Sequence, residues 1–342
     1  MPTRLFLSII VSLTLLLASC VDEEQHPNTP QGNFEALWTI IDQHYCFFND
    51  KHINWDSIHN AYAPRISSHM SQDQLFEVLS AMLANLKDGH VNLYSTFNTG
   101  RYWAWHEDHP QNFSDSLLRR YLGTNYAMAS GMKYRTLDDN IGYVYYPAFA
   151  TSISSGSIDD MLLHFAPCRA LIIDVRNNGG GSLDTARELA SHFTNTPTLV
   201  GYQRHKTGSG HTDFSSMQAQ TIEPSHGIRW QKPVVLLTNR SVYSAANEFV
   251  KYMMCFPGVQ AVGDSTGGGA GMPFMSELPN GWAVRFSAMP MYNREGQTTE
   301  WGIAPTYRVN ISSEDYQRGT DTIIEYARRL IAKGSSSKVL HP

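Results

Sequence analysis

Short apolar runs alternate with helical stretches through the second half of the chain. Residues 141–146, 171–175 and 234–238 are apolar enough to form buried strands. Helical stretches follow at 158–164 and 183–193. Strands that alternate with helices pair in parallel, and ligands then bind at the carboxyl ends of the strands. The pattern therefore predicts an α/β fold with its site at that edge.

Ser244 lies where the run 234–238 gives way to a helix. Phe249, Tyr252 and Met253 follow at the spacing of one helix face. The first backbone N–H groups of a helix have no partner within it, and the helix dipole favours negative charge there. A hydrolytic enzyme can place a nucleophilic serine at such a joint, but serine is also a common helix cap. This stretch alone leaves both roles open.

Composition limits the kinds of partner. The chain has 342 residues, 42% of them hydrophobic, which suffices for a large core and for two domains. A net charge of −5 gives no reason to expect nucleic acid as a partner. Apart from Cys20, the cysteines Cys46, Cys168 and Cys255 are odd in number and have neither zinc-site nor disulfide spacing. We therefore expect no metal, no cofactor and no nucleic acid.

The first residues have the features of an export signal and a tether. A positively charged start precedes an apolar stretch, 5–17, that is short for a permanent membrane span. The sequence Leu-Ala-Ser-Cys at 17–20 resembles a bacterial lipobox, so residues 1–19 would be removed and Cys20 lipidated. The alternative is an ordinary secretory signal. An acidic run follows, similar to that of surface-exported lipoproteins. We expect residues 20–31 to tether a lipoprotein of the cell envelope at the outer membrane, exposed at the surface, with the lipid as its only membrane contact.

Helical periodicity marks a separate unit before the α/β part. Phe34, Leu37, Trp38 and Ile41 share one helix face, and residues 71–74 resemble a capping box for a further helix. We therefore predict a helical domain over 32–88, an α/β catalytic domain over 89–332 and a flexible tail over 333–342.

A glycine-rich segment, 176–181, follows the predicted strand 171–175 and precedes a helix. Its backbone N–H groups would point into the cleft, and with the N–H of Ala245 they could stabilise a negatively charged oxygen. A dinucleotide-binding loop is the alternative, but the third glycine of that motif is missing. A serine nucleophile also needs a base, and among 14 histidines His90 and His211 are equal candidates.

Four short motifs decide between these alternatives. They are Asp-Gly-His at 88–90, Asp-Val-Arg-Asn-Asn-Gly-Gly-Gly at 174–181, Ser-Ala-Ala-Asn at 244–247 and Glu-Trp-Gly-Ile-Ala-Pro at 300–305. Each motif is weak alone, but in this order they resemble the tail-specific (C-terminal processing) and tricorn core serine protease family. The resemblance covers about residues 34–331 and implies a ClpP/crotonase-like α/β core.

The resemblance also implies a role for each matching residue. Ser244 would be the nucleophile and His90 the general base, while Glu300 would belong to the polar network that supports the base. The backbone N–H groups of Gly180 and Ala245 would hold the oxyanion.

The two branches of this family differ in their base. The processing peptidases use a lysine, but Gly269 stands where that lysine should lie. Lys251 follows Ser244 by seven residues, which is roughly 10 Å along a helix and on another face. The tricorn-like branch uses histidine with a serine before it, where this chain has Gly89. Residues 91–140 are too short for the PDZ module of the processing peptidases.

These roles predict a serine peptidase that acts on peptide or protein substrates outside the cytoplasm. Two alternatives remain, a non-catalytic ligand-binding module on the same fold and an esterase. If His90 is the base, activity should fall as the pH drops through a pKa near ~6.5. We also expect the loop 204–230 to act as a lid, with His211 and Asp213 near the substrate.

Overall fold

The computed structural model describes residues 26–107 and 109–337. The predicted signal peptide, the lipidation site Cys20 and half of the predicted tether lie outside these residues. Within them, no helix is both long enough and apolar enough to span a membrane. The first described helix, α2 (Pro30–His44), begins inside the predicted tether, because Thr29 caps it by accepting the N–H of Gly32.

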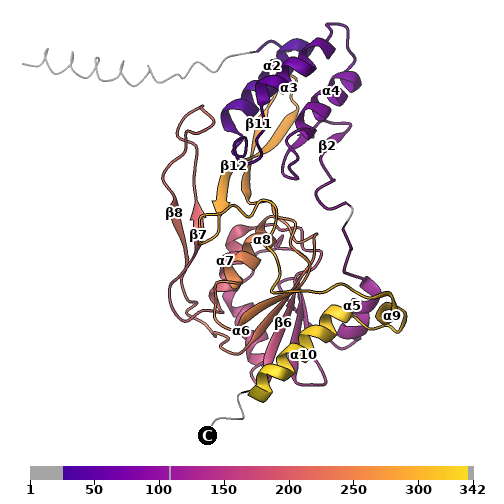
Figure 1. Cartoon of the computed structure of the whole chain (residues 1–342), viewed down its shortest axis with the longest axis vertical. Helices are drawn as coiled ribbons and strands as arrows, with labels where there is room; N and C mark the ends of the chain where they lie inside the picture. The colour runs from indigo at the N-terminus through magenta and orange to yellow at the C-terminus, as the bar shows by residue number, and fades with distance from the viewer. Residues whose placement is uncertain (1–25, 108, 338–342) are drawn as a thin grey trace, which may run out of the picture.

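A seven-stranded sheet forms the centre of the α/β part (Figure 1). In spatial order its strands are β13 (Tyr307–Arg308), β10 (Val259–Gly263), β9 (Val234–Thr238), β6 (Ala170–Asp174), β5 (Ile141–Tyr145), β4 (Met132–Thr136) and β3 (Ala127–Ala129). Neighbours from β13 to β5 are parallel, whereas β4 and β3 extend one edge as antiparallel strands. The predicted α/β class is confirmed.

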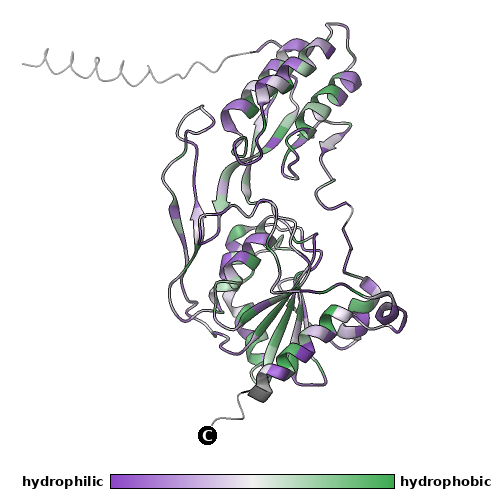
Figure 2. Cartoon of the chain, viewed as in Figure 1, coloured by the Kyte–Doolittle hydropathy of each residue, from purple (hydrophilic) through white to green (hydrophobic). Residues whose placement is uncertain are grey.

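Helices cover both faces of this sheet. They are α6 (Ser155–His164), α7 (Leu183–Ser191) and α8 (Ala245–Met253) on one face, and α5 (Asp115–Leu122) and α10 (Thr322–Ser337) on the other, with a short α9 (Ser313–Gln317) before α10. In β9, Val234 and Leu236 face the first group, whereas Val235 and Leu237 face the second. This is why the strands are apolar along their whole length (Figure 2). Helix α10 reaches Ser337, so the tail predicted from 333 begins too early.

A second, antiparallel sheet lies beside the first. Its strands are β2 (Thr99–Arg101), β1 (Asn92–Tyr94), β12 (Ala283–Tyr292), β7 (Thr198–Gln203) and β8 (Gln218–Ile222) in that order, with β11 (Gly271–Glu277) also paired to β12. Strand β8 lies within the predicted lid 204–230 and pairs with β7, so this part of the segment belongs to the second sheet.

The N-terminal helices complete their core with strands from the other end of the chain. Helices α3 (Trp55–Tyr62) and α4 (Gln72–Ala84), joined through a 3-10 turn (Ala63–Arg65), gather with α2 around β11 and β12 (Figure 1). Phe34 and Leu79 belong to the same apolar cluster as Trp282, Val284 and Phe286. The predicted helical domain 32–88 is therefore not a separate domain, because residues near 280 contribute to its apolar core. The predicted capping box at Ser71 and Gln74 is present.

Candidate active site

Ser244 occupies a sharp turn between β9 and α8. Its backbone has φ 58° and ψ −127°, a region that residues other than glycine rarely adopt. Two backbone bonds hold the turn, from Ser244 N–H to Gly268 O at 2.9 Å and from Tyr243 N–H to Asn178 O at 3.1 Å. The hydroxyl does not cap α8, so the capping role considered from the sequence is not taken by the side chain. A strained strand-to-helix turn of this kind is typical of an exposed nucleophile.

His90 reaches this hydroxyl from the loop that follows α4. Its Nε2 lies 3.0 Å from Ser244 Oγ. The histidine is only 2% exposed, its backbone N–H donates to Asp88 Oδ1 at 2.8 Å, and its ring packs edge-on against Tyr243. Of the two histidines considered from the sequence, His90 is the one that lies at Ser244.

Burial sets the protonation state of His90. Desolvation lowers the pKa of this imidazole to about 4, and the positive charges of Arg285 and Lys51 act in the same direction. Asp88 opposes the shift but does not reverse it. The ring is therefore neutral at neutral pH and can accept the proton of the serine. The pKa near 6.5 that was expected from the sequence is wrong for this environment.

The backbone amides beside Ser244 are the candidate oxyanion donors. The N–H of Ala245 donates to no acceptor among the described residues, as expected for the first residue of a helix. Gly180 packs against Ser244, since a Cβ built on it would lie 2.8 Å from Ser244 Cβ. Its N–H, however, already donates to Asn178 Oδ1 at 2.9 Å. The next amide, Gly181 N–H, has no acceptor within the described ranges, and Gly181 lines the same cavity as Ser244.

That cavity has a volume of about 340 Å³, and Ser244 forms part of its wall. Besides Ser244 and Gly181 it is lined by Leu183, Asp184, Gly271, Met272, Pro273, Arg285 and Met291. A mostly apolar cleft with a few polar groups is the usual form of a substrate site.

Lys51 holds together the loop that carries His90. Its Nζ donates to Glu300 Oε1 at 2.9 Å and to the carbonyls of Leu86 and Lys87 at 3.3 and 3.2 Å. It also lies 3.5 Å from Asp88 Oδ2, and these three charged side chains are almost completely buried. No sequence pattern singled out Lys51, because it lies in a turn far along the chain from every motif.

The two carboxyl groups around Lys51 differ in acidity. Burial opposes the ionisation of Asp88, but Lys51 and His90, with hydrogen bonds that include one from Ser287 Oγ at 2.9 Å, lower its pKa overall. Burial and the negative charge of Asp88 raise the pKa of Glu300 to about 7, although Lys51 works against the shift. Asp88 is therefore the carboxylate that stays ionised beside His90.

Comparison with known proteins places the chain in a family. The profile of peptidase family S41 matches residues 140–309, and that of the tricorn protease C1 domain matches residues 26–84. A crystal structure of a "putative peptidase" from Parabacteroides merdae is 49% identical, covers 89% of this chain and 97% of its own, and superposes with a TM-score of 0.85. The chain belongs to peptidase family S41.

More distant structures share the fold of this S41 serine peptidase. Mature CPAF complexed with lactacystin is 11% identical, with a TM-score of 0.66 over 89% of this chain and 97% of its own. The photosystem II D1 C-terminal processing protease is 14% identical, with a TM-score of 0.53 over 82% and 93%. At these identities the similarity shows the fold alone.

Gly89 stands where the histidine-using branch of the family has a serine, and the neighbouring side chains account for the difference. A Cβ built on Gly89 would lie 2.7 Å from Trp105 Nε1 and 2.8 Å from Tyr243 OH. Trp105 and Tyr243 stack with 4.2 Å between ring centroids. These rings fill the space that the side chain of a preceding serine would need. Trp105 lies in the segment between β2 and α5.

Glu300 therefore reaches His90 only indirectly. Its carboxylate accepts from Lys51 Nζ and from the N–H of Ala270 at 2.9 Å. His90 Nδ1 has no carboxylate or hydroxyl partner in the described part of the chain, and the backbone of Gly271 is the nearby group that favours the charged ring. As the resemblance implied, Glu300 lies in a polar network near His90. Lys51 lies between Glu300 and the loop that carries His90.

Lys251 does not approach the serine of this S41 peptidase. It forms a buried ion pair with Glu248 and donates to Gln220 Oε1 at 3.1 Å and Tyr292 O at 3.2 Å. The expectation that Lys251 is not the base agrees with these contacts.

His211 and Asp213 do not line the cavity at Ser244. His211 Nε2 lies 2.7 Å from Asp42 Oδ1 and the ring stacks on Phe48, while Asp213 accepts the N–H of Gly210 at 2.9 Å. These contacts fix the loop to the N-terminal helices. The prediction that the two residues lie near the substrate is wrong in this structure.

Proposed function

We propose that this S41 peptidase hydrolyses peptide bonds with Ser244 as nucleophile and His90 as general base. The observation that carries the proposal is the 3.0 Å contact between His90 Nε2 and Ser244 Oγ. A buried, neutral imidazole at hydrogen-bond distance from a strained serine is the arrangement that acyl transfer requires. Peptides or proteins are the substrates that the family supports.

The reaction proceeds in two halves. Ser244 Oγ attacks the carbonyl carbon, its proton passes to His90 Nε2, and the carbonyl oxygen becomes an oxyanion. The N–H groups of Ala245 and Gly181 stabilise that oxyanion at the start of α8, where the helix dipole adds to the effect. The intermediate then expels the amine, which takes the proton from His90. Water repeats the sequence on the acyl-enzyme and releases the second product.

Asp88, Lys51 and Glu300 act as positioning residues in this scheme. Asp88 accepts the backbone N–H of His90 and its negative charge favours the imidazolium that forms during the reaction. Lys51 joins Asp88 to Glu300 and anchors the carbonyls that precede the His90 loop. None of the three needs to touch the substrate.

The decisive experiment is cleavage of a mixed peptide library by protein that lacks residues 1–20, with products identified by mass spectrometry. Ser244→Ala should reduce turnover by roughly 10⁴-fold or more, because the nucleophile and base act as a unit. Ser116→Ala, a change of an exposed serine on α5, is the matched control and should retain full turnover. Cleavage by Ser244→Ala at the wild-type rate would show that the nucleophile is misassigned.

We also propose that the enzyme is a lipoprotein of the outer membrane, exposed at the cell surface and held there by Cys20. The proposal is supported by the Leu-Ala-Ser-Cys sequence at 17–20 and the acidic run that follows it. Cells that express the full chain should incorporate a fatty-acid label into it, and Cys20→Ser should abolish the labelling. Labelling that persists in Cys20→Ser would contradict the assignment.

A further inference from the structure

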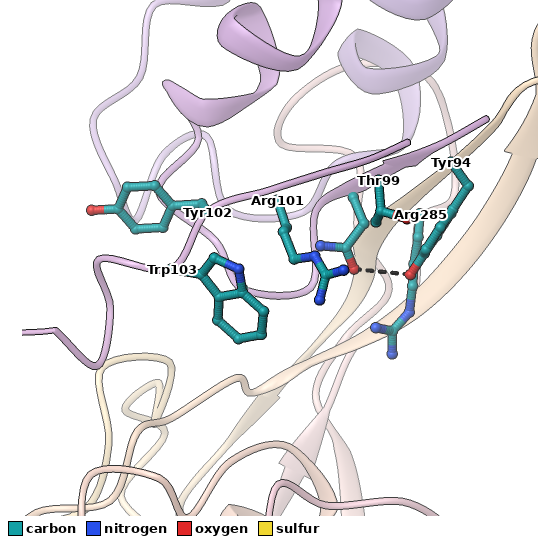
Figure 3. Close-up of a pocket in the computed structure, with 8 residues that line it drawn as sticks. Tyr94, Thr99, Arg101, Tyr102, Trp103 and Arg285 are labelled. Carbon is teal, nitrogen blue, oxygen red and sulfur yellow. Dashed lines mark hydrogen bonds between the residues drawn. The ribbon is translucent and has the colours of Figure 1, made fainter. Parts of the chain in front are cut away.

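A second cavity adjoins the active site. It has a volume of about 250 Å³ and is lined by residues that include Gly89, Asn92, Arg101, Trp103 and Arg285 (Figure 3). We call it the arginine pocket. Gly89 is the residue before His90, and Arg285 also lines the cavity at Ser244. The arginine pocket and the cavity at Ser244 are therefore neighbours that share the side chain of Arg285 in their walls.

The two arginines lie in one row across the second sheet. Asn92 on β1 is paired with Arg101 on β2 and with Arg285 on β12. Residues directly opposite one another in neighbouring strands project from the same face. Two strand spacings separate the arginine backbones by roughly 10 Å, so both guanidinium groups can reach one anion between them. Figure 3 shows both side chains extending on the same side of the strands.

Arg101 is exposed and Arg285 half-buried, and neither guanidinium has an anionic partner among the residues that the structure describes. In the described ranges, Arg101 and Arg285 form no ion pair and donate no hydrogen bond, and Arg101 instead lies over the ring of Trp103 at 5.1 Å. Asn92 Oδ1 accepts the hydroxyl of Tyr94 at 3.1 Å (Figure 3). A planar guanidinium that is left unpaired beside a cavity is suited to binding a carboxylate in two-point geometry.

The position of the arginine pocket indicates which part of a substrate it meets. His90 gives its proton to the departing amine, so the half of the peptide that leaves first lies on the His90 side of the scissile bond. Gly89 places the arginine pocket on that side, whereas Gly181, Leu183 and Asp184 line the cavity at Ser244. A group bound between Arg101 and Arg285 therefore belongs to the C-terminal part of the substrate.

We propose that the arginine pocket binds a carboxylate on the C-terminal side of the scissile bond. The carboxylate comes from an aspartate or glutamate side chain or from the free C-terminus of the peptide. This specificity rests on the proposed function, because it requires that the bond be cleaved at Ser244. Arg101 and Arg285 are the specificity-determining residues, and Trp103 holds the Arg101 guanidinium in place.

The test compares matched synthetic peptides that share a cleavage site found in the library. One pair carries Glu or Gln at each position C-terminal to that site, and a second pair ends in a free carboxylate or an amide. The wild type should cleave one acidic member with kcat/KM about tenfold or more above its neutral partner. Arg101→Gln and Arg285→Gln should each reduce that preference to about twofold or less. Arg119→Gln removes an equal charge from an exposed site on α5 and should keep the preference.

The ratio between matched peptides separates specificity from a general loss of activity. Arg285 contributes to the low pKa of His90, so Arg285→Gln can change the rate of cleavage of both peptides, but only loss of binding to the carboxylate changes their ratio. A preference confined to the Glu and Gln pair assigns the pocket to a side chain, and one confined to the second pair assigns it to the C-terminus. Ser244-dependent cleavage with no acidic preference, or an undiminished preference in both arginine variants, would overturn the carboxylate proposal. Absence of Ser244-dependent cleavage would instead overturn the proposed function.

Discussion

The serine side and the histidine side of the active site are built in different ways. Ser244, Ala245 and the glycine segment belong to the seven-stranded sheet and its connections, where backbone hydrogen bonds hold the turn at Ser244 and the Asn178 side chain holds Gly180 N–H. His90 lies at the edge of the second sheet, and its loop is held by the buried charges of Lys51, Asp88 and Glu300. The turn at Ser244 relies on local backbone strain, whereas the loop of His90 relies on buried charges that distant segments supply.

This difference determines how substitutions on each side affect activity and stability. Substitutions in the turn at Ser244 change the reacting group and the backbone strain, but they leave the charge of the site unchanged. A buried ion network contributes little net stability when complete, but it is costly when one member is removed. The two sides should therefore respond differently in assays of activity and of stability.

The largest effect on the serine side should come from Ser244→Gly compared with Ser244→Ala. Both remove the nucleophile and should lower kcat/KM by roughly 10⁴-fold or more. Only glycine tolerates φ 58° and ψ −127° without strain, so Ser244→Gly should be more stable than Ser244→Ala by about 1 kcal/mol. Denaturant unfolding measures the difference. Equal stability of the two variants would show that the turn stores no strain.

Gly180→Ala is the next most damaging change. The new Cβ would lie 2.7 Å from Tyr243 O and 2.9 Å from Ala245 N, at a backbone φ of 101°. Displacement of the oxyanion donors should cost about 10²- to 10³-fold in kcat. Gly179→Ala is the matched control, because nothing lies within 4 Å of its Cβ. Steady-state kinetics with similar losses in both variants would rule out this steric explanation.

Lys51→Met probes the histidine side. Asp88 and Glu300 would lose the cation they share, so the free energy of unfolding should fall by about 3–5 kcal/mol, with a loss of kcat as the His90 loop shifts. Thermal and denaturant unfolding measure the first effect and steady-state kinetics the second.

Two further variants sharpen this result. Lys87→Met changes an exposed lysine in the loop of His90. It should alter the free energy of unfolding by no more than about 0.5 kcal/mol. Lys51→Met combined with Glu300→Gln removes one of the orphaned charges and should recover part of the loss. A double variant less stable than Lys51→Met would contradict the buried-charge account.

The pH profile should give the smallest effect. His90 must be neutral to act as a base, so kcat/KM falls only as the pH drops through its pKa in the folded protein, which lies at about 4 instead of the ordinary 6.5. The same shift makes the folded state less stable as the pH falls from 6.5 toward 4, because the unfolded chain binds the proton first. Circular dichroism at each pH separates unfolding from inhibition. An acidic limb centred near 6.5 in folded protein would contradict a desolvated base.

The sequence predicts the serine side well and the histidine side only in part. Strand periodicity, the polar break after β9 and the glycine segment are local signals that make Ser244 and Ala245 candidates, and the resemblance to a family then favours nucleophile over helix cap for Ser244. His90 and Glu300 required resemblance to a family, because no local pattern distinguishes one histidine among 14.

Other features escaped prediction because they depend on packing between distant segments. Lys51 contacts Glu300 across 249 positions of the chain. The low pKa of His90 results from burial between such segments. His211 was misplaced for a similar reason, since its partner Asp42 lies 169 residues away.

Strand β12 has a consequence for how this architecture can be divided. The residues matched by the two family profiles, 26–84 and 140–309, suggest pieces that could be cloned or exchanged separately. The first piece, however, lacks Trp282, Val284 and Phe286, which form one wall of its apolar core. The carboxyl end of β12 pairs with β7, near the seven-stranded sheet. The modules recognised by sequence are thus not autonomous folding units, and chimaeras that join an N-terminal helical segment from one homologue to a catalytic region from another must also exchange the β11–β12 hairpin.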